Sequence, residues 1–400
     1  MDLQAIMQLD ATYYMNTFGK RTPVCFTKGE GIYLYDTEGK KYADFLAGIA
    51  VSALGHGHKT LTKALHEQVD KLLHTSSLYY IENQAKLAEQ IVTHSVADKV
   101  FFANSGAEAN EGAIKLAKIY FYKKNQTDKT DIITLTNSFH GRTLATVAAT
   151  GQPKYQKPYK PLTPGFCHVP ANDFEALCAA VTDKTAAVMM ELVQGESGVR
   201  PLDAEYVQKV AALCEEKGIL LIVDEIQTGM GRTGKLFCYE HYGIRPDIFT
   251  LAKALGGGVP IGALCAKAEI AAGFEPGDHG TTFGGNPLAT AAGLAVFQAF
   301  SEENIVQNSA EVGAYCKQAL EKLKDEFPVI KEVRGLGLML GVEFAEPVAK
   351  QVQAALLDKG FVVGAVGDSI LRLAPPLIVT KEQIDSFINN LTAHLATITR

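Results

Sequence analysis

Short apolar runs and helix-like patterns alternate through the middle of the chain, and this alternation limits the possible folds more than any other feature. The apolar runs lie at 99–103, 131–135, 186–192, 219–223, 247–251 and 261–266. Helical spacing of apolar residues is found between or after them, at about 106–123, 203–217 and 286–300. Such runs are typical of buried strands in parallel βα units. We therefore expect an α/β fold with a large, mostly parallel sheet.

The two ends of the chain have a different pattern and predict a second, smaller domain. Residues 24–45 alternate in hydropathy around a turn, as an antiparallel hairpin does. The segment after about 303 mixes helical patterns with short strands, which indicates an α+β arrangement. We expect residues 52–302 to form the large domain, and residues 1–51 and 303–400 to form the small α+β domain.

The charge and composition of the chain exclude several kinds of partner. The formal net charge is -6 and no Lys/Arg block is present, so we expect no nucleic-acid or membrane partner. The longest apolar stretches are strand-sized and the first residues do not resemble a signal peptide, so we expect a cytoplasmic protein. The seven cysteines lie far apart without a Cys-x-x-Cys pair, and we expect no metal site. Small-molecule substrates remain as the expected partners.

Two strand ends carry groups suited to carbonyl chemistry. Ligands of parallel sheets bind beyond the carboxyl ends of the strands. Asp224 directly follows the apolar run 219–223, and Lys253 follows the run 247–251 among alanine and glycine residues. Desolvation lowers the pKa of an amine and makes it a nucleophile, as a Schiff-base lysine requires. Taken singly, a helix cap for Asp224 and an ordinary surface lysine are the alternatives.

Two further strand ends complete a possible cofactor site. Small residues at Ser105, Gly106 and Ala107 open a long helical pattern, where backbone N–H groups and the helix dipole favour a phosphate. An aromatic ring and a guanidinium lie close together at Phe139 and Arg142. Taken singly, the first segment could be an ordinary capped turn, and the second could be a buried aromatic residue beside a surface ion pair. Together the four ends supply a phosphate cradle, an aromatic plate, a carboxylate and an imine-forming lysine, the parts of a pyridoxal-phosphate site.

The same segments resemble motifs of the class-III pyridoxal-phosphate aminotransferases. The motifs are FFANSGAEANEGAIKLAK, SFHGRT, ELVQGESGV, LLIVDEIQTGMGRTG, TLAKALGGGVPIGA, HGTTFGGNPLA and LRLAPPL. The pattern is most similar to the acetylornithine aminotransferases, with ornithine and 4-aminobutyrate aminotransferases as relatives. The resemblance implies the aspartate-aminotransferase-type fold of fold type I, pyridoxal 5'-phosphate as cofactor, and a homodimer with shared active sites.

The resemblance also implies which residues hold the cofactor. Those expected at the phosphate are Ser105, Gly106 and Ala107, with Thr282 from the other subunit. Those expected on the faces of the ring are Phe139 with His140 nearby, and Ile226. Asp224 would bind the ring nitrogen and favour its protonated form, and Gln227 would lie on the side of the ring hydroxyl. Lys253 would hold the cofactor as an imine and, once displaced, would shuttle a proton.

Two arginines and a glutamate match the substrate-binding positions of the family. Arg142 would bind the carboxylate distant from the reacting carbon, and Arg372 would bind the carboxylate beside that carbon in glutamate or 2-oxoglutarate. An arginine fork suits a carboxylate because it forms two parallel hydrogen bonds with it. Glu196 would pair with Arg372 when the substrate lacks the second carboxylate, since an unpaired buried arginine is costly.

Three more positions bear on the substrate through the same resemblance. Ile49 stands where ornithine aminotransferases have a tyrosine, which argues against free ornithine as the preferred donor. Phe18 stands where many relatives have a tyrosine, so a hydroxyl near the distal carboxylate is missing. Thr281 matches a position that contacts the acetylated substrate. The alternatives are a core role for Ile49 and a turn role for Thr281.

We therefore expect amine transfer from N2-acetyl-L-ornithine to 2-oxoglutarate, giving N-acetyl-L-glutamate 5-semialdehyde and L-glutamate, as in arginine biosynthesis. Succinylornithine, ornithine or 4-aminobutyrate as the donor, and an internal amine shift of the aminomutase kind, are the enzymatic alternatives. A non-catalytic regulatory protein that binds pyridoxal phosphate would be expected to lack the lysine, the aspartate or an arginine, and all are present. A nucleotide-binding oxidoreductase predicts a Gly-x-Gly-x-x-Gly turn, which is missing at a suitable place.

Overall fold

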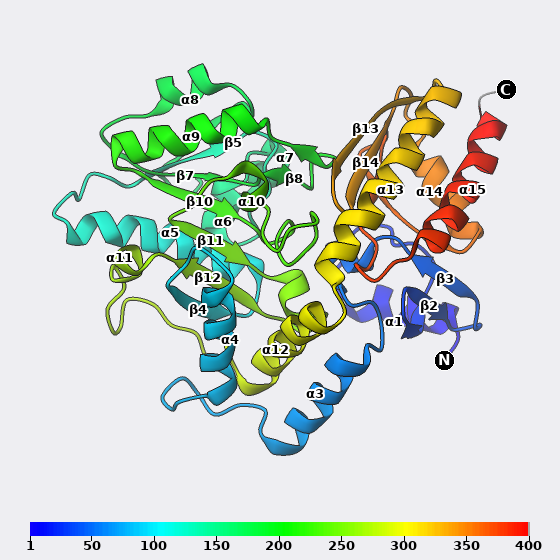
Figure 1. The fold of residues 1–400 in the computed structure, drawn as a ribbon, viewed down its shortest axis with the longest axis horizontal. Helices are drawn as coiled ribbons and strands as arrows, with labels where there is room; N and C mark the ends of the chain where they lie inside the picture. The colour runs from blue at the N-terminus through cyan, green and yellow to red at the C-terminus, as the bar shows by residue number, and fades with distance from the viewer. Residues whose placement is uncertain (399–400) are drawn as a thin grey trace.

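A seven-stranded sheet forms the centre of the larger part of the molecule (Figure 1). The computed structural model describes residues 1–398. The strand order is β4-β12-β11-β10-β7-β5-β6. The strands are β4 (Lys99–Ala103), β5 (Asp131–Leu135), β6 (Phe166–Val169), β7 (Thr185–Met190), β10 (Leu220–Asp224), β11 (Ile248–Leu251) and β12 (Gly262–Ala266). Neighbouring strands pair in parallel except at β12, which is antiparallel to both β11 and β4. The predicted α/β fold with a mostly parallel sheet is confirmed.

Helices cover both faces of this sheet, which explains its continuous apolar strands. In β10, Leu220 and Ile222 pack into a core shared with α5 (Gly106–Lys123), and Leu221 and Val223 pack into the core on the opposite face. That opposite core includes apolar residues of α9 (Ala204–Lys217). Strands buried on both sides need no polar alternation, so β10 is apolar until its last residue.

The other helices of the larger part connect the strands or pack at the edges of the sheet. They are α3 (Lys59–Lys71), α4 (Glu82–Thr93), α6 (Leu144–Ala149), α7 (Pro153–Gln156), η1 (Lys157–Tyr159), α8 (Phe174–Ala180), α10 (Tyr239–Tyr242), η2 (Lys253–Gly256), α11 (Ala268–Ala271) and α12 (Pro287–Glu302). A two-stranded ribbon joins β8 (Val193–Gln194) to β9 (Arg200–Pro201). Among residues 1–398, none of the helices is both sufficiently long and sufficiently apolar to cross a lipid bilayer.

The smaller part brings the two ends of the chain together. One sheet has the order β1-β2-β3-β15 and the other has the order β13-β14-β17-β16. The strands are β1 (Phe26–Glu30), β2 (Tyr33–Asp36), β3 (Lys41–Asp44), β13 (Ile330–Leu336), β14 (Met339–Phe344), β15 (Phe361–Val362), β16 (Gly364–Val366) and β17 (Ile370–Leu373). The helices are α1 (Leu3–Tyr13), α2 (Ala47–Ala50), α13 (Ile305–Glu326), α14 (Ala349–Asp358) and α15 (Lys381–Ile398). The predicted N-terminal antiparallel hairpin is confirmed.

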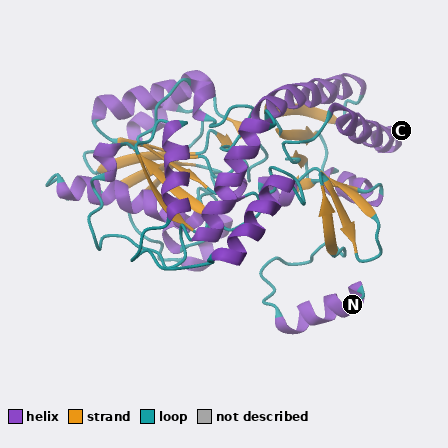
Figure 2. Cartoon of the chain, turned by 60° about the horizontal axis from the view of Figure 1, so that its bottom comes forward, coloured by secondary structure: helices purple, strands orange, loops and turns teal. Residues whose placement is uncertain are grey.

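The parallel pairing of β3 with β15 bears on the domain division, because it joins the N-terminal hairpin to the C-terminal segment. This pairing supports the boundaries expected above, which we keep as a proposal: 52–302 for the large domain, with 1–51 and 303–400 for the small one. Residues 399–400 lie outside the described part of the chain. Helix α1 has no buried residue, and Figure 2 shows it set apart from both sheets at the end of an extended segment.

Candidate active site

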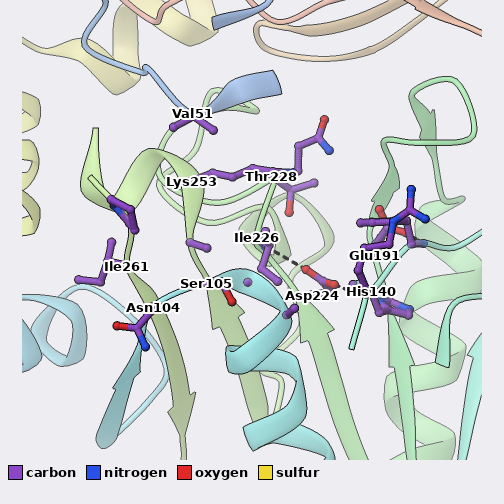
Figure 3. Close-up of a pocket in the computed structure, with 18 of the residues that line it drawn as sticks. Val51, Asn104, Ser105, His140, Glu191, Asp224, Ile226, Thr228, Lys253 and Ile261 are labelled. Carbon is purple, nitrogen blue, oxygen red and sulfur yellow. Dashed lines mark hydrogen bonds and ion pairs between the residues drawn. The ribbon is translucent and has the colours of Figure 1, made fainter. Parts of the chain in front are cut away.

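A cavity of about 420 Å³ lies at the carboxyl ends of the central strands (Figure 3). Its size is within the usual range for small-molecule sites. It brings together many of the residues singled out from the sequence: Ser105, Gly106, Ala107, Phe139, His140, Arg142, Asp224, Ile226, Gln227 and Lys253. They follow different strands and converge because parallel strands end at the same edge of the sheet.

The first turn of α5 forms one end of the cavity. Ser105 caps the helix, since its hydroxyl accepts a hydrogen bond from the N–H of Glu108 at 3.2 Å. A side chain at Gly106 would not fit, because its Cβ would lie 2.8 Å from Cδ1 of Ile226. A Cβ at Gly262 of β12 would lie only 2.2 Å from the carbonyl oxygen of Ser105. The tight packing leaves a helix N-terminus beside the cavity, where N–H groups and the helix dipole favour an anion.

Asp224 is held in place by three hydrogen bonds at the end of β10. Its Oδ2 accepts from Nδ1 of His140 and from Nδ2 of Asn110, each at 2.8 Å, and its Oδ1 accepts from the N–H of Ile226 at 3.0 Å. Asn110 also accepts a bond from the hydroxyl of Thr250 at 2.8 Å. The carboxylate is only 4% exposed, so these donors stabilise a buried negative charge beside the cavity.

Lys253 begins the short helix η2 and lines the same cavity. Burial lowers the pKa of its amine, opposed by the charges of Glu196 and Asp224 and assisted by that of Arg372. Its backbone has a φ of 46°, in the left-handed region that residues with a side chain rarely adopt. Strained backbone of this kind clusters at functional sites. A neutral amine at this position can act as a nucleophile or take up a proton.

Arg142 lies exposed at the edge of the cavity against two aromatic rings. Its guanidinium carbon is 4.0 Å from the centre of the Tyr155 ring and 5.6 Å from that of Phe139. The two rings meet edge to face, with their centres 5.7 Å apart. Stacking orients a guanidinium while leaving its N–H groups free for a carboxylate.

Glu196 and Arg372 form an ion pair, with 2.5 Å between Oε1 and Nη1. Burial would raise the pKa of the Glu196 carboxyl, but the charge and hydrogen bond of Arg372 outweigh it and hold that pKa below its ordinary value. The charge of Lys253 and a hydrogen bond from Gln227 act in the same direction. Within residues 1–398, Nε of Arg372 and Oε1 of Gln227 are buried without a hydrogen-bond partner. Such atoms are free to bond a ligand placed beside them.

Six of the residues expected at the site do not line this cavity: the paired Glu196 and Arg372, and Phe18, Ile49, Thr281 and Thr282. Phe18 is 71% exposed and lies under the guanidinium of Arg21, with 5.4 Å from its ring centre to the guanidinium carbon. Thr282 is exposed and borders a separate hollow. The hydroxyl of Thr281 accepts hydrogen bonds from Asn104 at 3.3 Å and from the N–H of Gly284 at 3.1 Å. The remaining one is Ile49.

Ile49 belongs to a left-handed turn beside the cavity. Ala47, Gly48, Ile49 and Ala50 all have φ between 50° and 67°, although left-handed backbone usually occurs as single residues. Oδ1 of Asp44 accepts hydrogen bonds from the N–H groups of Leu46 and Ala47, and its Oδ2 lies 3.0 Å from Nε2 of His56. These contacts hold the turn, and Val51, which follows it, lines the cavity.

Some residues around the cavity were missed by sequence reasoning. Asn110 orients Asp224, Tyr155 stacks on Arg142, and Glu191 lines the cavity wall. Glu191 had a usable signal, because it directly follows the apolar strand β7 as Asp224 ends the apolar β10. Tyr155 had none, since its contact with Arg142 arises only from the fold.

The comparisons with known proteins agree with this geometry. The aminotransferase class-III family matches residues 14–395. The chain is 55% identical over 381 residues to an acetylornithine aminotransferase of Gloeobacter violaceus, with 95% of each chain covered. It is 51% identical over 385 residues to one of Methanocaldococcus jannaschii, with 96% of each covered.

Solved structures give the same result. The ornithine aminotransferase from Toxoplasma gondii ME49 has a TM-score of 0.95 at 31% identity, covering 100% of this chain and 96% of that one. An acetylornithine aminotransferase from Elizabethkingia anophelis has a TM-score of 0.89 at 32% identity, covering 99% of this chain and 100% of that one. The similarity therefore extends over both parts of the fold.

Proposed function

Since the chain belongs to the class-III aminotransferases, we propose that it transfers the terminal amine of N2-acetyl-L-ornithine to 2-oxoglutarate. The products are N-acetyl-L-glutamate 5-semialdehyde and L-glutamate. The observation that carries this proposal is the ion pair of Glu196 with Arg372, whose charges both act on Lys253. The relatives named acetylornithine aminotransferase, at 44–55% identity, support the choice of donor.

The enzyme is a transaminase that depends on pyridoxal phosphate, and the cavity fits that cofactor. The N-terminus of α5 offers an anion site with no room for a side chain at Gly106. Asp224 supplies a buried carboxylate, and Oε1 of Gln227 is buried without a partner among residues 1–398. When bound, pyridoxal phosphate supplies an aldehyde that condenses with amines and a ring that withdraws electrons from the substrate carbon.

We propose that Lys253 and Asp224 are the two catalytic residues. Nζ of Lys253 would bind the cofactor aldehyde covalently and, after displacement by the substrate amine, would carry a proton to and from the reacting carbon. Its lowered pKa supports both tasks, because a neutral amine is needed for each. Asp224 would hold a proton on the ring nitrogen, since a buried carboxylate favours the positively charged partner. The hydrogen bonds that its Oδ2 accepts from His140 and Asn110 support this role, because they fix the orientation of the carboxylate.

The remaining residues of the site would bind the cofactor and orient its ring. The backbone at Ser105, Gly106 and Ala107, with Thr282 from a second subunit, would hold the phosphate. Phe139 with His140 and, opposite them, Ile226 would flank the ring, with Gln227 on its hydroxyl side. Such a clamp fixes the ring so that proton transfer occurs on one face.

We propose a switch that accommodates the two substrates in one site. Arg142 would bind the distal carboxylate of either substrate through the N–H groups that its stacking leaves free. Glu196 would neutralise Arg372 while acetylornithine is bound and would release it for the second carboxylate of 2-oxoglutarate. The pairing seen at 2.5 Å supports the first of these states. Thr281, Phe18 and Ile49 would contribute contacts at the acyl end of the donor.

We propose a homodimer with shared sites. Exposed Thr282 supports this arrangement, as do the exposed apolar residues Leu78, Tyr79 and Phe283 and the unburied helix α1. Large exposed apolar side chains in one region are typical of surfaces that another protein covers. The substrates themselves are small molecules.

Glu196→Ala tests the switch. We expect the half-reaction with acetylornithine to slow about tenfold or more relative to the half-reaction with glutamate, because an unpaired Arg372 would draw the single carboxylate of the donor away from Arg142. Each half-reaction can be followed in single turnovers as the loss of the visible absorbance of the cofactor-loaded enzyme. If both rates stay unchanged, Glu196 is no switch.

A panel of donors tests the proposed reaction. The cofactor-loaded protein is mixed in turn with N-acetylornithine, N-succinylornithine, ornithine and 4-aminobutyrate, and the loss of visible absorbance is timed. Fastest conversion by acetylornithine, reversed by 2-oxoglutarate, is the expected result. Faster conversion by another amine would replace the proposed donor, and no conversion by any of the four would contradict the proposed function.

A further inference from the structure

Glu191 is a buried carboxylate on the cavity wall that has no part in the roles described so far. It directly follows β7 and is only 6% exposed. Its Oε1 accepts a hydrogen bond from the N–H of Phe139 at 2.7 Å, and its Oε2 accepts one from the N–H of Gly195 at 3.2 Å. Figure 3 shows it beside His140 at the side of the cavity.

The two N–H groups belong to two different loops. Phe139 lies in the loop after β5, which continues to Arg142. Gly195 lies in the loop after β8, and the next residue is Glu196, the partner of Arg372. One side chain thus bonds the loop that carries Arg142 to the loop after β8. The carbonyl oxygens of Gly198 and Val199 in that second loop accept hydrogen bonds from Arg334 of β13, which belongs to the same sheet as Arg372 of β17.

The two N–H groups offset part of the burial of the Glu191 carboxyl. Burial raises the pKa of its carboxyl to about 7, opposed by the charge of His140 and assisted by that of Asp224. The N–H groups of Phe139 and Gly195 lower this pKa because they stabilise the ionised form. A hydrogen bond to an ionised group is about twice as strong as one between neutral groups. Glu191 therefore binds both loops most firmly as a carboxylate.

We propose that Glu191 is a positioning residue that fixes the separation of Arg142 from Arg372, and so selects the length of the dicarboxylate substrate. This inference rests on the proposed function for the identity of that substrate. A dicarboxylate must reach both groups at once, whereas a monocarboxylate needs only one. Loss of the link between the two loops should therefore weaken the binding of dicarboxylates more than that of monocarboxylates.

Glu225 offers a matched control. It is also a buried carboxyl, 1% exposed, and burial likewise raises its pKa to about 7. It accepts hydrogen bonds from the hydroxyl of Thr228 at 2.6 Å and the N–H of Tyr239 at 2.8 Å, and it does not line the cavity. Substitution by glutamine has the same chemical effect at either site, because the amide NH₂ replaces one acceptor with a donor.

The test compares the cofactor-loaded wild type with Glu191→Gln and Glu225→Gln by titration calorimetry. The ligands are glutarate, a five-carbon dicarboxylate that cannot react, and pentanoate, its monocarboxylate counterpart. We expect Glu191→Gln to weaken the binding of glutarate about tenfold or more and the binding of pentanoate less than about threefold. The KM for 2-oxoglutarate should rise by a similar factor while kcat changes little. Glu225→Gln should leave both affinities unchanged.

If the two ligands lose affinity equally, or if neither loses affinity, the proposed role of Glu191 is wrong. If Glu191→Gln does not fold, Glu191→Asp replaces it, because the shorter side chain keeps the charge but reaches only one of the two loops. The calorimetry requires no turnover, so it decides this inference even if N-acetylornithine proves not to be the donor. Failure of the wild type with N-acetylornithine would count only against the proposed function.

Discussion

Lys253→Ala is expected to lower kcat with acetylornithine and 2-oxoglutarate by at least about 10³-fold. The substitution removes the only amine that lines the cavity among the described residues. It should also weaken retention of the cofactor, because the covalent link is lost. The measurement is steady-state turnover together with the visible absorbance of the protein after gel filtration.

Lys267→Ala is the control for this prediction. Lys267 is a half-buried lysine paired with Asp247 at 2.8 Å, and it lies outside the cavity. Its loss should leave turnover within about threefold of wild type, as for a surface ion pair. The proposed role of Lys253 would be wrong if Lys253→Ala kept more than about a tenth of the wild-type kcat.

Asp224→Asn is expected to lower kcat by about 10²- to 10³-fold, the size seen when one well-placed electrostatic group is removed from an active site. The amide keeps the shape of the carboxylate but loses its charge, so it cannot favour a proton on the ring nitrogen. It also turns one acceptor into a donor that faces His140 and Asn110. Cofactor affinity, measured by titrating the apoenzyme, should fall as well.

Glu225→Gln separates this effect from general damage to the end of β10. It alters the adjacent buried carboxyl, which bonds Thr228 and Tyr239 and does not itself line the cavity. We expect a lower melting temperature and near-normal kcat for this variant. Equal losses of kcat in the two variants would mean that Asp224 acts through packing alone.

The sheet could be predicted from the sequence wherever strands are buried on both faces. The run Ile219–Val223 became β10 because its neighbours cover it on each side. The edge strand β6 was missed, since its Cys167 and His168 are not buried and leave no apolar run. The direction of β12 was also missed. Only residues 252–261 separate it from β11, which is too short for the crossover that a parallel strand requires.

The site could be predicted as far as strand ends could be recognised. Asp224 and Lys253 each follow an apolar run, so their convergence follows from parallel pairing. The order within the cavity could not be predicted, because it depends on contacts between distant segments. Asn110 of the helix α5 bonds Asp224, and Glu191, which follows β7, bonds Phe139, which follows the neighbouring strand β5. Periodicity contains no information about such pairs.

Thr282 lies exposed, away from the cavity that contains Lys253 of the same chain. In the proposed dimer, each site would take its lysine from one subunit and its threonine from the other. Lys253→Ala and Thr282→Asp should each be inactive alone, the second because its charge repels a phosphate. Refolded as an equal mixture, they should recover roughly a quarter of wild-type activity, since half the dimers are hybrids with one intact site. Two inactive proteins would thus complement each other. If each site were formed by one subunit alone, the mixture would recover no activity.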